Sequence, residues 1–230
     1  SLDELSGGRA ILGLGSGDAS VRMVDRSPAR VQTMREAIQT IRSLSRGEWV
    51  QYGKRKVRMK NAESRQGPIP IYMAAQGPRM LELAGELADG VILLAGIAPH
   101  NLDYALTHVR TGAQRAGRSL EDLEVILGVH CYVGEDWRQV QKQARPFCAL
   151  IATHAPDAFR ASGIPVPEPK PMPDLYPDAT HAEDWEKAVA LTDWIPDETL
   201  KQFCAQYTLM GDGEEIVRKL QGVVSRGISH

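Results

Sequence analysis

Short apolar runs alternate along the chain with longer stretches in which apolar residues recur every three or four positions. The short runs lie at residues 10–14, 67–75, 91–94 and 124–133, with glycine, proline or polar residues around them. Runs of this length predict buried β-strands. The longer stretches predict amphipathic helices at residues 28–47, 78–87 and 99–116, from Asp136 onward, and from 211–213 through Val224. A hairpin is expected around Gly53, and a further strand begins at 227–230.

This alternation of strands and helices predicts an α/β fold with a parallel sheet. A doubly wound sheet and a (β/α)8 barrel share the pattern, so periodicity alone leaves both open. In either fold, ligands bind at the carboxyl ends of the strands. The loops that follow the strands are therefore where we look for chemistry.

A proline-rich stretch at about 156–196 interrupts the alternation. It contains eight of the fourteen prolines. We predict that it is a long, semi-rigid loop inserted into a single domain of residues 1–230. A loop of this length is either a lid or partner surface or a mobile flap, and the sequence leaves both interpretations open.

The charges are balanced overall but unevenly distributed. The chain has 27 Lys and Arg against 29 Asp and Glu, a net charge of −2, which gives no global field to attract nucleic acid or an anionic membrane. Residues 22–65 hold 12 basic and 4 acidic residues, whereas residues 168–198 hold 9 acidic and 2 basic ones. We interpret the basic stretch as a solvated face, with an anion-steering surface as the alternative. We expect a small-molecule substrate, and no nucleic acid or membrane partner.

Composition narrows the class of protein further. With 43% hydrophobic residues and no apolar run of 18, the chain is expected to be a soluble globular protein. The three cysteines, Cys131, Cys148 and Cys204, lack metal-ligand spacing and fit a reducing, cytoplasmic compartment. The first residues show no secretion signal.

Two of the loops after predicted strands are unusual. The first is Gly13-Leu-Gly15-Ser16-Gly17-Asp18, where alternate glycines let the backbone approach a flat ligand and Asp18 places a carboxylate at the active end of the strand. Because GxGxG lacks the spacing of a dinucleotide fingerprint, we do not assign one. A glycine-rich turn with Asp18 as a cap is the alternative.

The second loop is Ala74-Ala75-Gln76-Gly77-Pro78-Arg79-Met80. Small residues followed by Gly and Pro at a helix start leave backbone N–H groups free at the positive end of the helix dipole, which suits a phosphate. Arg79 could add a charge-assisted hydrogen bond. An ordinary turn with proline at the first helical position explains the same residues equally well.

Two histidines, His130 and His154, are possible catalytic groups. His130 lies within a predicted strand, where a core or barrel-interior histidine is the favoured interpretation, and His154 is expected at the surface. The sequence contains no nucleophile elbow, P-loop, HExxH or paired-cysteine motif.

These loops also carry a resemblance to a known family. The segments 5–18, 70–80, 83–91, 209–215 and 227–230 together resemble the bacterial luciferase-like monooxygenase superfamily, and within it the branch of the coenzyme F420-dependent methylenetetrahydromethanopterin reductases. The resemblance implies a (β/α)8 barrel that binds FMN or F420 and transfers hydride at the ring. It implies that Ala75, Gln76, Gly77, Pro78, Arg79 and Met80 receive the cofactor phosphate and that Gly15, Ser16 and Gly17 lie near the ring.

The same resemblance gives Asp18 a role and the chain a place in the barrel. An acidic residue in the equivalent loop is catalytic in sugar-phosphate dehydrogenases of the superfamily, so Asp18 is the candidate catalytic residue. The predicted strands would be barrel strands 4–7 plus the start of strand 8. We therefore expect an incomplete barrel, the central and C-terminal portion of a longer chain, since a complete barrel has about 250 residues.

The function expected is hydride transfer between F420, or FMN, and a small organic substrate, in a homodimer or higher homo-oligomer. An FMN-dependent monooxygenase that uses O2 and a partner reductase is one alternative. A truncated, inactive fragment that acts only as a binding module is the other.

Overall fold

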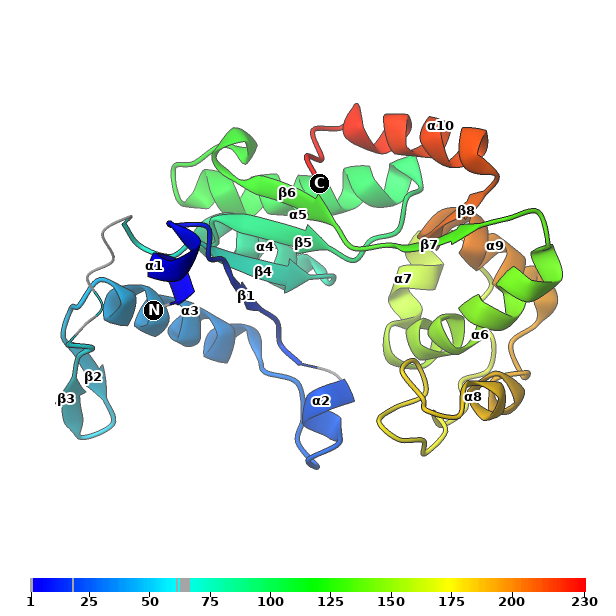
Figure 1. Cartoon of the computed structure of the whole chain (residues 1–230), viewed down its shortest axis with the longest axis horizontal. Coiled ribbons are helices and arrows are strands. Elements are labelled where there is room, and N and C mark those ends of the chain that lie inside the picture. The colour runs from blue at the N-terminus through cyan, green and yellow to red at the C-terminus, as the bar shows by residue number, and fades with distance from the viewer. Residues whose placement is uncertain (1, 18, 61, 63–66) are drawn as a thin grey trace.

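A computed structural model describes residues 2–17, 19–60, 62 and 67–230 of the chain. Its main sheet has four parallel strands in the order β1-β4-β5-β6, as an α/β fold requires (Figure 1). The strands are β1 (Leu12–Leu14), β4 (Ile71–Ala75), β5 (Gly90–Leu93) and β6 (Glu124–Leu127). The predicted parallel α/β fold is confirmed, and within the described residues the sheet does not close into a barrel.

The C-terminal residues lie alongside β6. The amide of Ser229 donates to the carbonyl of Val125, and the amide of Leu127 donates to the carbonyl of His230. The strand expected to begin at 227–230 therefore lies beside β6. This leaves β1 at one edge of the sheet and the C-terminus at the other.

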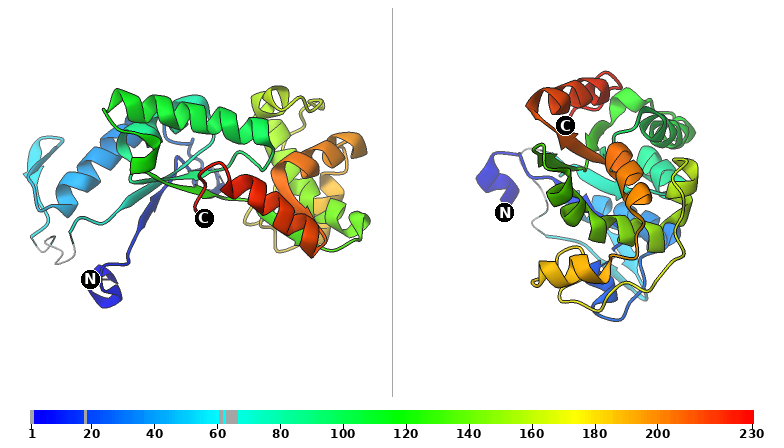
Figure 2. Two further views of the ribbon diagram at one scale, coloured as in Figure 1. Left: turned by 90° about the horizontal axis from the view of Figure 1, so that it is seen from above. Right: turned by 90° about the vertical axis from the view of Figure 1, so that its right-hand side faces the viewer.

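Three helices cover one face of the sheet (Figure 2). They are α3 (Val31–Ser45), α4 (Pro78–Leu87) and α5 (Pro99–Arg115), close to their predicted positions. Each buries one stripe of apolar side chains against the strands, as an amphipathic helix does. The shared core contains Met34, Ile38, Leu81, Leu83, Leu102, Leu106 and Val109 from the helices, with Ile71, Met73, Val91, Leu93 and Val125 from the strands.

The predicted fourth strand, residues 124–133, is two strands rather than one. β6 ends at Leu127, and β7 (His130–Val133) leaves the main sheet to pair in parallel with β8 (Thr208–Gly211). β8 was not predicted, because it follows α9 (Asp197–Tyr207) directly, with no turn residue between them. The helix α10 (Gly213–Val224) then begins at the predicted place, capped by Asp212.

The stretch 156–196 is not the continuous loop that the sequence predicted. It contains α7 (Pro156–Ala161), which starts with proline at its first turn, and α8 (Trp185–Leu191), whose first turn is capped by the Asp184 carboxylate. Irregular chain remains between them, at residues 162–184. Together with α6 (Trp137–His154) and α9, these helices gather beyond the carboxyl ends of β4–β6 (Figure 1).

This helical part has a hydrophobic core of its own. Phe159 and Phe203 are fully buried, and the Phe203 ring stacks on Tyr207 with centroids 5.0 Å apart. Stacked and tilted aromatic pairs add stabilisation beyond the area they bury. Side chains of this core therefore hold the stretch 156–196 in place. Its description as an insertion into a single domain stays a prediction.

The remaining elements are a hairpin and three short helical segments. The predicted hairpin around Gly53 is present as β2 (Val50–Tyr52) and β3 (Arg55–Val57), with Gly53 at φ +57° in the turn. The short helices are α1 (Leu2–Ser6), α2 (Ala19–Arg22) and the 3₁₀ turn at Leu120–Asp122.

Helices α4 and α5 approach each other closely at two glycines. A Cβ atom on Gly85 would lie 2.0 Å from the carbonyl oxygen of Val109, and one on Gly112 would lie 1.8 Å from the carbonyl oxygen of Glu82. Both distances are impossible for real atoms, so the backbones touch only because no side chain stands between them. This contact sets the positions of the helices that follow β4 and β5.

We predict that Gly85→Ala or Gly112→Ala lowers the free energy of unfolding by about 3 kcal/mol or more, because backbone atoms would have to separate. Gly222→Ala is the matched control, since it lies within α10 with no neighbouring atom within 4 Å of the added Cβ. It should leave stability unchanged or raise it by up to about 1 kcal/mol. Urea unfolding measures all three, and equal effects would contradict the close-contact interpretation.

A bidentate ion pair joins α3 to α4. The Arg35 guanidinium donates to both carboxylate oxygens of Glu86, and these hydrogen bonds hold the pKa of Glu86 below its ordinary value of 4.5. Both side chains are about three-quarters buried. The pair therefore fixes the two helices side by side at the surface of the core.

Because the pKa of Glu86 is lower in the folded state than in the unfolded chain, its contribution to stability is present above pH 4.5 and is lost as the pH falls through the folded value. We predict that Glu86→Gln costs about 1 kcal/mol at pH 7 and nothing once Glu86 is protonated in the wild type. Unfolding measured from pH 7 down to pH 3 would show the two curves converging. Glu121→Gln, at an exposed position, is the control and should run parallel to the wild type.

Candidate functional site

The second face of the sheet, opposite α3–α5, is open and lined by small residues. Side chains alternate between the two faces of a strand, and paired residues of parallel strands share a face. Since Ile71, Met73 and Ala75 face the helices, the open face carries Gly13, Tyr72, Ala74, Gly90, Ile92, Glu124 and Ile126. Gly15 and Gly128 continue this series at the carboxyl ends of β1 and β6.

Glycines make the carboxyl half of this face shallow and accessible. The Cβ that Gly15 lacks would lie 3.7 Å from the Cβ of Ala74, on the neighbouring strand, and the Cβ that Gly128 lacks would lie 2.8 Å from the Leu94 side chain. Gly13 and Gly15 are exposed, and Ala74 and Ile92 are half-buried. We call Gly13, Gly15, Ala74, Ile92 and Gly128 the glycine platform. A flat ligand could lie against the backbone here, as the alternate glycines of the first loop predicted.

Larger polar side chains fill the amino-terminal half of the same face. The Tyr72 hydroxyl donates to Glu124, whose other carboxylate oxygen lies 2.8 Å from Nε2 of His230. Burial and the hydrogen bond to Glu124 raise the pKa of Tyr72 to about 12, so Tyr72 stays protonated. The ring of Tyr72 lies against Gly90. These contacts join β4, β6 and the C-terminus, and they limit the accessible part of the face to its carboxyl end.

Two helices begin at the same edge of the sheet. Neither α3 nor α4 has a side chain that caps its first turn, and α4 starts with Pro78, which has no N–H group. The two N-termini line one cleft of about 830 Å³, formed by Ala29, Arg30, Val31, Gln32, Gly77, Pro78, Arg79 and Met80. Uncapped N–H groups at the positive ends of two helix dipoles favour a bound anion between them.

Two arginines add full positive charge to this cleft. Arg30 and Arg79 are exposed, and neither side chain has an ion-pair or hydrogen-bond partner in the part of the chain that the structure describes. Unpaired guanidinium groups are well suited to bidentate binding of phosphate. We call the eight lining residues the anion cleft.

A hydrogen bond ties the first glycine loop to the anion cleft. The amide of Ala29 donates to the carbonyl oxygen of Ser16 over 2.7 Å. The chain therefore runs from the platform at Gly15 through residues 16–17 and returns beside the cleft at Ala29. Gly17 has φ +82°, which glycine adopts without strain. One ligand could therefore place a ring on the platform and a phosphate in the cleft.

The predicted site residues divide into three groups. Gly77, Pro78, Arg79 and Met80 line the anion cleft, and Gly15 lies on the platform, with Ser16 and Gly17 in the loop that joins it to the cleft. Ala75 is buried among the helices, and Gln76 is half-buried at the end of β4. Asp18, the candidate catalytic residue, lies outside the described residues.

Sequence reasoning missed part of both regions. Residues 29–32 were assigned only to the start of a helix, although Pro28 before an uncapped first turn was the same kind of signal as Gly77-Pro78. Gly128 was counted within a continuous strand, and its place on the platform depends on the sheet register.

The histidines do not contribute to this site. His130 is exposed on β7, with its ring 4.5 Å from that of Phe147 on α6. The predicted core or barrel-interior position is therefore wrong, because β7 turns away from the main sheet. Partial desolvation and the nearby His181 lower the pKa of His130. His154 is exposed, as predicted.

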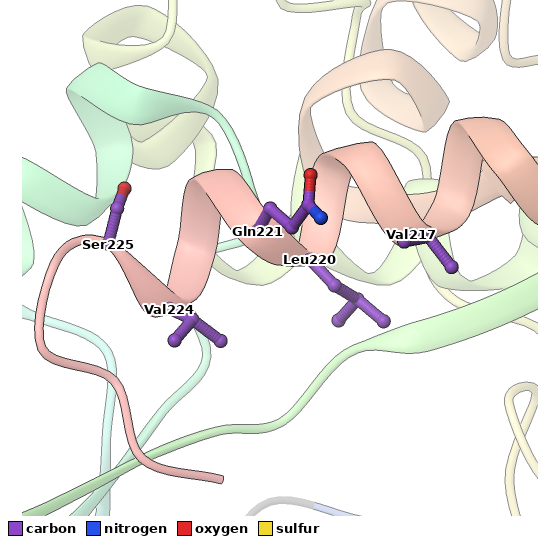
Figure 3. A pocket seen from close by; sticks show the side chains of 5 residues that line it. All are labelled: Val217, Leu220, Gln221, Val224 and Ser225. Atoms are coloured by element: carbon purple, nitrogen blue, oxygen red, sulfur yellow. The ribbon is translucent and has the colours of Figure 1, made fainter.

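Other features give no further chemistry. A shallow apolar hollow of about 410 Å³ runs along α10 beside Val217, Leu220 and Val224, with Gln221 and Ser225 at its rim (Figure 3). Over the described ranges, no three His, Cys, Asp or Glu side chains meet in a way that could hold a metal ion. Nor does any described helix have the length and hydropathy to cross a membrane.

Comparison with known proteins identifies the family. The model of the luciferase-like monooxygenases matches residues 1–230. The chain belongs to the luciferase-like monooxygenase family. The resemblance inferred from the two loops is thereby confirmed.

Individual relatives are longer than this chain. The chain is 36% identical over 161 residues to a 5,10-methylenetetrahydromethanopterin reductase of Methanolobus tindarius, a match that covers 68% of the chain and 49% of the relative. It is 27% identical to an F420-dependent glucose-6-phosphate dehydrogenase of Nakamurella multipartita, covering 100% of the chain and 63% of the relative. The chain thus spans between about half and two thirds of these proteins.

A solved structure agrees with the incomplete barrel. The coenzyme F420-dependent tetrahydromethanopterin reductase from Methanopyrus kandleri superposes with a TM-score of 0.65 at 24% identity, over 97% of this chain and 67% of that one. The parallel sheet of this chain is therefore part of a luciferase-like (β/α)8 barrel, as predicted.

Two substitutions in the first glycine loop, at Gly15 and Gly17, test its geometry without a ligand. Gly15→Ala should change the free energy of unfolding by less than about 0.5 kcal/mol, because the new Cβ only touches Ala74 at an ordinary distance. Gly17→Ala should cost about 1–2 kcal/mol, since φ is +82° and the Cβ would lie 2.6 Å from Cγ1 of Val21. Thermal unfolding compares the two, and an equal or larger loss at Gly15 would contradict the accessible platform.

Proposed function

We propose that the chain is the cofactor-binding portion of an F420-dependent oxidoreductase that transfers hydride between the deazaflavin and a small organic substrate. The observation that carries the proposal is the pairing of an accessible glycine platform with an anion cleft along one edge of the sheet. The platform presents glycine backbone where a larger side chain would obstruct a ring, and the cleft presents uncapped N–H groups and two arginines to a phosphate. The names of the relatives support F420 as the ligand.

The residues present fit such a cofactor. A side chain larger than methyl at Gly15 would occupy the space beside Ala74 where a ring would lie. Arg30 and Arg79, with the free N–H groups of α3 and α4, would hold the phosphate at the other end. When bound, the deazaflavin supplies the hydride chemistry, and the protein supplies orientation and electrostatics.

We infer the class of substrate from the names of the relatives. Similarity to a methylenetetrahydromethanopterin reductase favours a pterin-like carbon carrier, whereas similarity to a glucose-6-phosphate dehydrogenase allows a sugar phosphate. Asp18 remains the predicted proton-handling group, as an acidic residue following the platform strand. An FMN-dependent monooxygenase is the second candidate, because the platform would accept any flat tricyclic ring.

Binding titrations of the purified chain with F420 and with FMN test the proposal. We expect F420 to bind and FMN to bind more weakly, measured by fluorescence quenching of each cofactor. Gly15→Leu should abolish binding while leaving the fold intact, because its side chain would project over the platform. Arg79→Ala should weaken binding about tenfold by removing a charge-assisted hydrogen bond.

Arg110→Ala is the matched control, since Arg110 is exposed on α5 away from the anion cleft and should bind as the wild type does. Tighter FMN binding with oxygen consumption by the reduced form would favour the monooxygenase. If neither cofactor bound the folded chain, the remaining candidate would be a module without cofactor chemistry.

A further inference from the structure

The carboxyl edge of the sheet has one half that the anion cleft leaves free. The cleft lies at the starts of α3 and α4, the helices that follow β1 and β4 in the chain. Because the strand order is β1-β4-β5-β6, the free half lies at the ends of β5 and β6 (Figure 1). Under the proposed function, on which this inference rests, the substrate reaches the ring over this half. We call residues 94–98 and Gly128 the substrate edge.

Leu94 presents an apolar side chain at the substrate edge. It directly follows β5 and leaves the same face of the sheet as Ile92 of the glycine platform, two residues earlier. A Cβ added to Gly128 would lie 2.8 Å from Cδ2 of Leu94, so the leucine side chain extends across the neighbouring strand. Even so, 44% of its surface is exposed. A substrate over the platform would therefore meet an aliphatic contact here.

The amino end of α5 borders the substrate edge and is closed to an anion. Like α4, this helix starts with proline and has no side chain that caps its first turn. The amides of Ile97 and Ala98, at its start, both donate to the carbonyl oxygen of Gln206, over 2.7 and 3.1 Å. That carbonyl supplies the partial negative charge that a phosphate supplies at an open helix start. The start of α5 therefore differs from the two that line the anion cleft.

Gly96 and a buried polar cluster hold this closed arrangement together. Gly96 has φ +75°, and a Cβ there would lie 2.5 Å from the carbonyl oxygen of Gln206 and 2.8 Å from Cα of Tyr207. The Ser162 hydroxyl donates to Oδ1 of Asn101 on α5 over 2.9 Å, and its oxygen lies 2.8 Å from the Tyr207 hydroxyl. All three of these polar side chains are buried. Uncharged hydrogen bonds thus fix the end of α9 on the start of α5.

We propose that the substrate edge selects a substrate whose reacting end is apolar and uncharged, with Leu94 as the specificity-determining residue. A phosphate placed here would lose its hydration, meet the leucine side chain and find the amides at the start of α5 already bonded. An uncharged alcohol, carbonyl or methylene carbon pays no such penalty. Of the substrate classes that the relatives suggest, the sugar phosphate is therefore disfavoured.

Inorganic phosphate tests the closed edge without any cofactor. We expect Arg30→Ala/Arg79→Ala, whose anion cleft lacks both guanidinium groups, to bind phosphate at least tenfold more weakly than the wild type. The amide NMR signals of residues 94–98 should stay unshifted by phosphate in both proteins. Adding Leu94→Arg to this variant should restore phosphate binding, with shifts at residues 94–98, because a guanidinium group then lies at the substrate edge. Adding Leu94→Met instead is the matched control and should restore nothing.

Two probe alcohols test the selectivity in the chain loaded with F420. We expect cyclohexanol, which is apolar and uncharged, to change the absorption spectrum of bound F420, and glucose 6-phosphate at the same concentration to leave it unchanged. Leu94→Arg should reverse this preference, with at least a tenfold gain in affinity for glucose 6-phosphate and a comparable loss for cyclohexanol. Leu94→Met should behave as the wild type does, since it keeps an apolar side chain of similar volume. Circular dichroism confirms that each variant is folded.

The two experiments have separate outcomes for the substrate edge and for the proposed function. If F420 does not bind the folded chain, the proposed function fails, and the phosphate experiment still decides whether the substrate edge excludes anions. Phosphate-dependent shifts at residues 94–98 in the wild type would overturn the closed edge. A preference of the F420-loaded wild type for glucose 6-phosphate, or probe binding unchanged by Leu94→Arg, would overturn Leu94 as the specificity-determining residue.

Discussion

Parallel pairing of the strands is the constraint on which the rest of the structure depends. Each helix that connects two parallel strands must return the chain to the amino end of the sheet, so all strand carboxyl ends lie at one edge. The helices that follow β1 and β4 then begin at that same edge, with their positive dipole ends toward it. The anion cleft is thus a consequence of topology, and the sequence needs only to leave the first turns uncapped and place Arg30 and Arg79 beside them.

Glycine serves two different purposes in this arrangement. On the helix side, Gly85 and Gly112 let α4 and α5 touch, which makes the scaffold rigid. On the open side, Gly13, Gly15 and Gly128 keep side chains away from the strand ends, which leaves space for a ligand. The first use is recognisable only from the structure, because a glycine within a helix has no feature that shows which backbone it approaches. The second was partly visible in the sequence, since alternating glycines followed a strand.

Much of the parallel sheet could be predicted because each strand and helix there has a local signal. The apolar run 91–94 predicts a buried strand, and the amphipathic stretch 99–116 predicts a helix, without reference to the rest of the chain. β8 could not be found, since Thr208 continues directly from α9 and its strand character comes from pairing with β7. The helices α7 and α8 were hidden by surrounding prolines, although Pro156 and Asp184 act as helix starts. In the site, residues 77–80 were accessible to sequence reasoning, whereas Gly128 depended on register.

The two positively charged regions of this chain lie at opposite ends of α3. The anion cleft uses two arginines and helix dipoles at the carboxyl edge of the sheet, whereas the exposed basic residues of the β2–β3 hairpin, within residues 46–60, follow the far end of α3. With α3 about 22 Å long, at 1.5 Å per residue over its 15 residues, the two positive regions are separated by more than two Debye lengths at physiological salt. The hairpin charges therefore do little to hold a phosphate in the cleft.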